Sequence, residues 1–381
     1  MSHLLAELDV RGPFVPASCG SCPKGVRTEL SLRDDTSCFV SALIEGEVTT
    51  NDRLMDAVGR DLQHCDLSEI RLTQTFTRPK IMEKTLDPRN QDHIEEIAAK
   101  IKVDLSLHTN EERRPTVGIV CGSGFRAIME LMDLCVDFPF NTLPGFPNTI
   151  EVEGHLPILT LARLKNTEVF VLVLQGRLHP YEFNMDMAFC AVPIRVMAIL
   201  GVTKLILTNA TGAINMSYRT RDYMLMRDHI FLPGLAGMSP LAGITDARMG
   251  IRFVAIDGAY DRKVNKALME FAKSQDELTV HEGVYVMQGG PEYETTAELN
   301  YLRMVGADCV GMSVCHEAIV AKQLNMRLIG ISMITNDLHD KEKSGSNLNH
   351  KDVLAVGTEV ATNTKNLIQE AIKLMAADVS E

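Results

Sequence analysis

Short apolar runs alternate with amphipathic segments along the chain from residue 92 onward. The run Val169–Leu174 is continuous, short and rich in branched residues, which predicts a buried β-strand. Comparable runs predict further strands at Thr116–Cys121, Ile158–Leu164, Lys204–Thr208, Tyr223–Met226, Val284–Met287, Cys309–Met312 and Leu328–Ile334.

Helical periodicity appears between these runs. Apolar residues recur at helical spacing at Ile94, Ile97, Ala98, Ile101 and Leu105. Asp92 precedes them and is the predicted N-cap. Further helices are predicted at Met187–Leu200, Thr295–Val305, Glu317–Leu324 and Asp352–Met375. Alternation of this kind predicts an α/β fold, a single domain with a central mixed, mostly parallel β-sheet flanked by helices.

The first ninety residues have a different pattern, with short polar stretches and few long apolar runs. We predict that residues 1–90 form an appended, partly disordered extension and that residues 91–381 form one domain. The pair Cys19 and Cys22, with Cys38, His64 and Cys65, offers side chains that bind zinc. Their spacing fits no standard zinc site, so ordinary free thiols are the favoured interpretation and no metal is expected.

Composition excludes several classes of protein. The 381 residues carry a formal net charge of -12, which argues against a general nucleic-acid binder. No run approaches the roughly 18 apolar residues of a membrane span, and the N-terminus lacks a basic segment followed by an apolar one. Nine cysteines scattered through apolar runs suit free thiols in a reducing compartment, so we expect a cytoplasmic protein with no membrane partner.

Polar side chains gather where the predicted strand Val169–Leu174 ends. Arg177, His179, Tyr181 and Glu182 follow it within a few residues. Ligands of open α/β folds bind at the carboxyl ends of strands. Residues two apart in an extended segment point the same way, so Arg177 and His179 together would seat a dianion such as phosphate. The alternative is a solvated loop with incidental charge.

Two other strand ends are built for close backbone approach. Gly122, Ser123 and Gly124 follow the strand at Thr116–Cys121, and a serine between glycines suits an oxyanion. An ordinary tight turn explains the same residues. Small residues also occupy Thr208–Ala213, where either accessible backbone amides or a plain strand-to-turn transition is expected.

The remaining strand ends offer groups for a heterocycle. Tyr293 and Glu294 open a predicted helix, where an acidic residue serves either the helix dipole or a bound ring. Met312 is predicted to be a core residue and Ser313 a second anion donor. Asn336 closes the last strand with an amide that both donates and accepts. His350, beyond the polar loop at 337–349, is most simply a helix-start residue.

Taken together and in this order, the motifs resemble those of the trimeric purine nucleoside phosphorylase family over roughly three quarters of the chain. The matching segments are Cys121-Gly-Ser-Gly, Gln175-Gly-Arg-x-His-x-Tyr-Glu, Thr208-Asn-Ala-x-Gly, Arg227-Asp-His-Ile with Leu232-Pro-Gly, Gly290-Pro-x-x-Glu-Thr, Val310-Gly-Met-Ser and Ile334-Thr-Asn. The resemblance implies a homotrimer that performs reversible phosphorolysis of inosine, guanosine and their 2′-deoxy forms (EC 2.4.2.1) in purine salvage. It implies no cofactor, with inorganic phosphate as co-substrate.

The resemblance also implies roles for individual residues. The implied phosphate site comprises Ser123, His155, Arg177, His179, Ala210 through its backbone, and Ser313. The implied nucleoside site comprises Tyr181, Tyr293, Glu294, Met312, Asn336 and His350, with Met249 reaching a neighbouring subunit's site. His179, Glu294 and Asn336 are the implied catalytic residues.

The chain departs from the family pattern at several positions, and two rival functions stay open. The departures are Phe125-Arg126, Glu153, Thr211, Met249 and Cys315-His316. None removes a polar group of the implied site. A 5′-methylthioadenosine phosphorylase is one rival, although that family has acidic residues where Asn336 stands. A catalytically weak nucleoside-binding homologue is the other.

Overall fold

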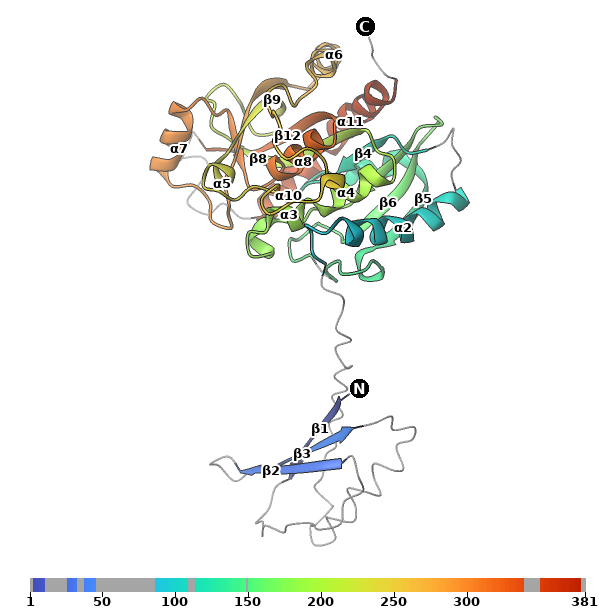
Figure 1. Ribbon diagram of the computed structural model, residues 1–381. Coiled ribbons are helices and arrows are strands. Elements are labelled where there is room, and N and C mark those ends of the chain that lie inside the picture. Colours follow the sequence, from blue (N-terminus) through green and yellow to red (C-terminus); the bar gives the residue numbers. More distant parts are fainter. Residues whose placement is uncertain are drawn as a thin grey trace. The chain divides into compact units, whose positions relative to one another are not determined.

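The computed structural model describes residues 3–10, 26–32, 38–45, 86–108, 114–148, 150–338 and 350–377. The chain divides into two compact units, Met1–Glu83 and Lys84–Glu381. In the first unit, strands β1 (His3–Val10), β2 (Val26–Leu32) and β3 (Cys38–Glu45) form an antiparallel sheet with β3 in the centre (Figure 1). Most of the predicted extension lies outside the described residues, including Cys19, Cys22, His64 and Cys65.

Nine of the described strands in the second unit form one sheet, in the order β11-β10-β9-β12-β8-β4-β7-β6-β5. They are β4 (Val117–Val120), β5 (Met132–Pro139), β6 (Ile158–Leu164), β7 (Phe170–Leu174), β8 (Lys204–Ala213), β9 (Tyr223–Phe231), β10 (Val280–Met287), β11 (Cys309–Gly311) and β12 (Arg327–Asp337). Parallel pairs connect β7, β4, β8 and β12, while β5, β6 and β7 are antiparallel. Because β11 also pairs with β8, the strands β8, β12, β9, β10 and β11 close into a ring.

Helices cover both faces of this sheet (Figure 1). They are α2 (Gln91–His108), α3 (Met187–Cys190), α4 (Val192–Ile199), α5 (Leu232–Leu235), α6 (Arg262–Lys273), α7 (Thr296–Met304), α8 (Cys315–Gln323), α10 (His350–Glu359) and α11 (Ala361–Ala376), with the short 3-10 turns η3 (Arg126–Leu131), η4 (Phe140–Thr142), η5 (Pro180–Glu182) and η6 (Ala247–Met249). One core cluster takes apolar residues from α2, α4 and α8, and a second takes them from α6 and α11. The predicted mixed α/β architecture is therefore confirmed.

Several local predictions were wrong. The helix α2 begins at Gln91, one residue before the predicted cap, and Asn90 Oδ1 accepts from the Asp92 amide at 2.9 Å in its place. Strand β8 continues to Ala213 beyond the predicted end at Thr208, because its backbone pairs with β12 on one edge and β11 on the other. The small residues at 208–213 therefore belong to a strand and form no turn.

Three elements differ from the pattern for separate reasons. Strand β5 and helix α6 were not predicted. Strand β5 pairs with a single strand at the end of the sheet. Helix α6 did carry a helix signal, because Asp261 caps its first turn and its apolar residues lie on one face. The predicted helix Asp352–Met375 is divided at Val360, whose ψ of 14° departs from the helical value of about −42°. Val360 is buried, so the chain bends where this side chain enters the core.

Candidate active site

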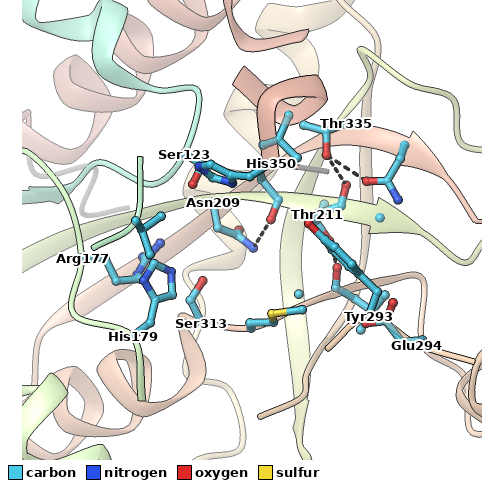
Figure 2. Close-up of a pocket in the computed structure, with 18 of the residues that line it drawn as sticks. Ser123, Arg177, His179, Asn209, Thr211, Tyr293, Glu294, Ser313, Thr335 and His350 are labelled. Carbon is cyan, nitrogen blue, oxygen red and sulfur yellow. Dashed lines mark hydrogen bonds between the residues drawn. The ribbon is translucent and has the colours of Figure 1, made fainter. Parts of the chain in front are cut away.

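A pocket opens at the carboxyl ends of the central strands and gathers most of the predicted site residues. Those that line it are Ser123, Arg177, His179, Tyr181, Ala210, Tyr293, Glu294, Met312, Ser313, Asn336 and His350. Arg177, His179 and Ser313 lie toward one end, while Tyr293 and Glu294 lie toward the other (Figure 2). The pocket thus has a cationic end and an end suited to a polar ring.

His155 does not line the pocket but bonds to a residue that does. His155 Nδ1 lies 3.2 Å from the Arg177 backbone nitrogen and 3.4 Å from the Arg177 carbonyl oxygen. The shorter contact, in which the amide donates to Nδ1, is the basis for assigning the proton of the neutral ring to Nε2. Burial lowers the pKa of His155 well below its usual value, with smaller contributions from the nearby His179 and Arg177, which favours this neutral form. Nε2 then donates to Ser123 Oγ at 3.1 Å. The Ser123 hydroxyl proton is left to donate to an anion.

His179 is oriented by the carboxylate three residues later. Glu182 Oε2 lies 3.1 Å from the His179 backbone nitrogen and 3.3 Å from His179 Nδ1. Burial lowers the pKa of His179, and the bond to Glu182 partly offsets that effect. With Nδ1–H directed at Glu182, Nε2 of the neutral ring is available to the pocket as an acceptor, for example from the P–OH group of phosphate, and it donates only when the ring is protonated. The rings of His155, His179 and Tyr181 stack in series, with centroids 5.1 and 5.0 Å apart.

Arg177 is fixed by a buried carboxylate that the sequence argument did not single out. Its Nε and Nη2 donate to the two oxygens of Glu317 at 3.0 and 2.8 Å. Nη1 donates to the Thr208 carbonyl at 2.8 Å. Three of the five guanidinium protons are therefore committed to the protein, and two are left for a ligand. The guanidinium also lies close behind Gly122, where an added Cβ would come within 2.9 Å of Nη1.

The opposite end of the pocket contains the predicted base-binding groups. Thr335 Oγ1 donates to Asn336 Oδ1 at 3.0 Å, which assigns the amide so that Nδ2 is available as a donor. Gly212 makes room for that amide, since an added Cβ would lie 2.9 Å from Nδ2. Gln288 Nε2 donates to Glu294 Oε1 at 2.6 Å, and burial raises the pKa of Glu294. Tyr293 is half-exposed beside it.

His350 and Met249 are placed very differently. His350 begins α10, and its Nε2 donates to the Glu153 carbonyl at 2.8 Å, which holds the ring at the pocket edge. Met249 is not among the pocket residues, and its side chain is only 1% exposed within its own chain. Its implied contact with a neighbouring subunit stays a prediction.

Neither a thiol nucleophile nor a resident metal is indicated in the described part of the chain. Burial raises the pKa of Cys121 to about 12, so this thiol beside the Ser123 loop is not a thiolate at neutral pH. No cluster of three His, Cys, Asp or Glu residues suited to a metal occurs among the described residues. None of the described helices is long and apolar enough to cross a bilayer.

Glu317 and Gln288 are neighbours that sequence analysis missed, while Thr335 was part of the Ile334-Thr-Asn motif but was given no role. Each contacts a predicted site residue, namely Arg177, Glu294 and Asn336. The signal for Glu317 was available, because it is one carboxylate within the apolar segment Val314–Ala321, and a buried charge requires a partner. Gln288 and Thr335 gave no comparable signal.

Comparisons with known proteins agree with this geometry. The model of the phosphorylase superfamily matches residues 116–373. Purine nucleoside phosphorylase of Bos taurus is 37% identical over 274 residues, which are 72% of this chain and 92% of that protein. Structures of purine nucleoside phosphorylase from Schistosoma mansoni with adenosine and with inosine are each 33% identical, with a TM-score of 0.67 for the first and 0.66 for the second. Each covers 77% of this chain, and the match spans 99% and 98% of those two chains. The chain therefore belongs to the purine nucleoside phosphorylase family of the phosphorylase superfamily and is a pentosyltransferase of class EC 2.4.2.1.

Proposed function

We propose that this pocket catalyses the reversible phosphorolysis of 6-oxopurine nucleosides. Inosine, guanosine and their 2′-deoxy forms would yield the free base and ribose or deoxyribose 1-phosphate. The observation that carries this proposal is the pairing of an anion site around Arg177 with an amide donor, Asn336, and a carboxylate, Glu294, in one pocket.

The phosphate end would hold both the nucleophile and the counter-charge of the reaction. Ser123, His179, Ser313 and the two free protons of Arg177 are its proposed ligands, with the Ala210 backbone beside them. As the glycosidic bond breaks, the sugar becomes oxocarbenium-like, and a phosphate dianion beneath it stabilises the positive charge. His155 acts behind Ser123, because it leaves that hydroxyl free to donate. Tyr181, Met312 and His350 would surround the ribose.

The base end would stabilise the departing purine. Asn336 Nδ2 can donate to N7, where electron density accumulates as the base leaves. The Glu294 carboxylate can accept N1–H of a 6-oxopurine, with Tyr293 against the ring. No covalent protein intermediate and no cofactor is needed, so catalysis rests mainly on positioning and electrostatics.

Glu294 and Asn336 together favour a 6-oxopurine over the substrate of the first rival function. Adenosine and 5′-methylthioadenosine present a 6-amino donor and an N1 acceptor, so Glu294 would face a lone pair. A mismatched buried polar group costs about 1–3 kcal/mol. The structure of the Schistosoma mansoni enzyme in complex with adenosine shows binding of adenosine by that relative. For this chain, we propose that adenosine and 5′-methylthioadenosine are cleaved more slowly than inosine.

We further propose the setting that the family resemblance implies. The enzyme would act as a homotrimer in the cytoplasm, within purine salvage, with inorganic phosphate as co-substrate and no nucleic-acid partner. The net charge of -12 supports the last point.

The test is the phosphate dependence of inosine cleavage. Hypoxanthine and ribose 1-phosphate should form in equal amounts, with a rate that saturates in phosphate or arsenate. Equal turnover in phosphate-free buffer would identify a hydrolase. Tight inosine binding without turnover would favour the catalytically weak binding protein instead.

A further inference from the structure

Arg89 joins three segments that are far apart in the sequence. It lies in the turn that precedes α2, where its backbone nitrogen donates to Asp87 Oδ1 at 2.9 Å. Its Nη1 and Nη2 donate to the two oxygens of Asp186 at 2.9 and 3.0 Å. Its Nε donates to the Ala242 carbonyl at 3.0 Å. This two-pronged geometry is specific to a guanidinium, because a lysine ammonium cannot reproduce it.

Asp186 ends a strained turn and starts the next helix. Its Oδ1 accepts from the amides of Ala188 and Phe189 at 3.1 and 3.2 Å, so it is the N-cap of α3. The two residues before it, Asn184 and Met185, have φ values of 51° and 59°. Non-glycine residues in this left-handed region cost of order 1–3 kcal/mol each and persist only where the surroundings hold them. Arg89 fixes the end of this turn.

The turn supports both walls of the pocket. On its N-terminal side it is continuous with η5, which carries Tyr181 and the Glu182 carboxylate that orients His179. The Met185 amide donates back to the Pro180 carbonyl at 2.8 Å. On its other side, the Met185 methyl group packs on Gly289, where an added Cβ would lie 3.0 Å from it. Gly289 begins the loop that leads to Tyr293 and Glu294.

We propose that Arg89 is a positioning residue for the nucleoside end of the pocket, acting through Asp186 and the 183–186 turn. The inference rests on the proposed nucleoside site. Arg89 also lies within residues 1–90, which were predicted to form the extension. Arg89 lies within the compact unit Lys84–Glu381, so removal of residues 1–83 spares it and removal of residues 1–90 does not.

The experiment compares Arg89→Gln, Asp186→Asn and the double variant in the full-length protein. Asparagine is as good an N-cap as aspartate, so Asp186→Asn removes the ion pair and keeps the cap. Arg327→Gln is the matched control. Arg327 pairs with Asp261, which caps α6, at 2.7 Å and with comparable exposure, but neither residue lines the pocket. The KM values for inosine and for phosphate, kcat and the melting temperature are measured for each protein.

Each single variant should raise the KM for inosine roughly three- to tenfold and the KM for phosphate by a smaller factor, because η5 also carries the Glu182 that orients His179. The double variant should match the singles. Arg327→Gln should leave both KM values unchanged. Additive effects, or a lower melting temperature with an unchanged inosine KM in the Arg89 and Asp186 variants, would overturn the inference. If the wild-type protein does not cleave inosine in a phosphate-dependent way, the proposed function itself is refuted. The same assay distinguishes this result from a failure of the role assigned to Arg89.

Discussion

Arg177 and Glu317 form a bidentate ion pair in which each side chain is only 1% exposed. The pair connects the strand end after β7 to the first turn of α8. Burying two charges is costly unless their geometry is good and further hydrogen bonds satisfy them. Here the Thr208 carbonyl supplies one further acceptor for Arg177. The arrangement fixes the guanidinium before any anion arrives, which is what a preorganised phosphate site requires.

The first prediction follows from this pair. Glu317→Ala leaves the Arg177 charge buried and unpaired, which should lower the free energy of unfolding by about 3–5 kcal/mol. Glu317→Gln also removes the counter-charge but keeps the shape and one acceptor, so it should be destabilised less than the alanine variant. It should lose roughly tenfold or more in kcat because the guanidinium is no longer held by two oxygens. Urea unfolding and steady-state kinetics measure the two effects. Wild-type kcat in a folded Glu317→Gln protein would show that the pair has no catalytic importance.

The second prediction concerns pH and base choice. Burial raises the pKa of Glu294, so its carboxyl protonates at a higher pH than an ordinary glutamate as the solution is acidified. The protonated form is a weaker acceptor for N1–H of inosine, and it can donate to N1 of adenosine. The ratio of kcat/KM for inosine to that for adenosine should therefore fall as the pH falls. Titrations of phosphate and His179 affect both substrates and cancel in the ratio.

Glu294→Gln provides the control for this prediction. An amide does not titrate, so the ratio should become independent of pH in that variant. A wild-type ratio that stays constant down to the limit of stability would contradict the assigned role of Glu294.

The third prediction concerns His316, which replaces a residue typical of the family. Its side chain is fully buried, and within the described residues neither ring nitrogen has a hydrogen-bond partner. Burial lowers its pKa to about 4 from the usual 6.5, against the attraction of Glu317. Below pH 6.5 the unfolded chain therefore binds a proton that the folded chain does not. The contribution of neutral His316 to the free energy of unfolding is therefore fully present above pH 6.5, and it decreases as the pH falls toward 4.

His316→Leu should remove this dependence. Between pH 8 and pH 5 the wild-type protein should lose on the order of 2 kcal/mol more stability than the variant, because the other titrating groups are common to both proteins and only the wild type has His316. Urea midpoints at the two pH values measure the difference. Parallel losses in the two proteins would show that His316 is protonated in the folded state.

The fourth prediction concerns the first compact unit. The pocket residues lie between Ser123 and Val353, and the match to the phosphorylase superfamily begins at residue 116. Deletion of residues 1–83 should leave inosine phosphorolysis within about twofold of the full-length value, since none of the described residues among them lines the pocket. A folded truncated protein that has lost activity would assign the first unit a role in catalysis or assembly.

The sequence allowed the fold class and most pocket residues to be predicted, for a specific reason. Buried strands appear as apolar runs, and the polar residues just beyond them, such as Arg177 and Asn336, converge where parallel strands end. Contacts between distant segments leave no such local trace. The strand at Lys204–Thr208 was predicted to end too early, because the small residues after it do not form an apolar run, whereas pairing with β11 and β12 keeps the chain extended to Ala213. The links Arg177–Glu317 and Arg89–Asp186 span 140 and 97 positions, which no periodic pattern could indicate.

In the proposed function, Asn336 and Glu294 select a 6-oxopurine for phosphorolysis. The most direct test is kcat/KM for inosine and adenosine at neutral pH and saturating phosphate, in the wild-type protein and in Asn336→Asp. Because adenosine would make two mismatched polar contacts, kcat/KM of the wild type should be roughly a hundredfold or more higher for inosine than for adenosine. Asn336→Asp should narrow that ratio, because a carboxylate accepts from the 6-amino group. Equal rates, or a preference for adenosine in the wild type, would contradict the account.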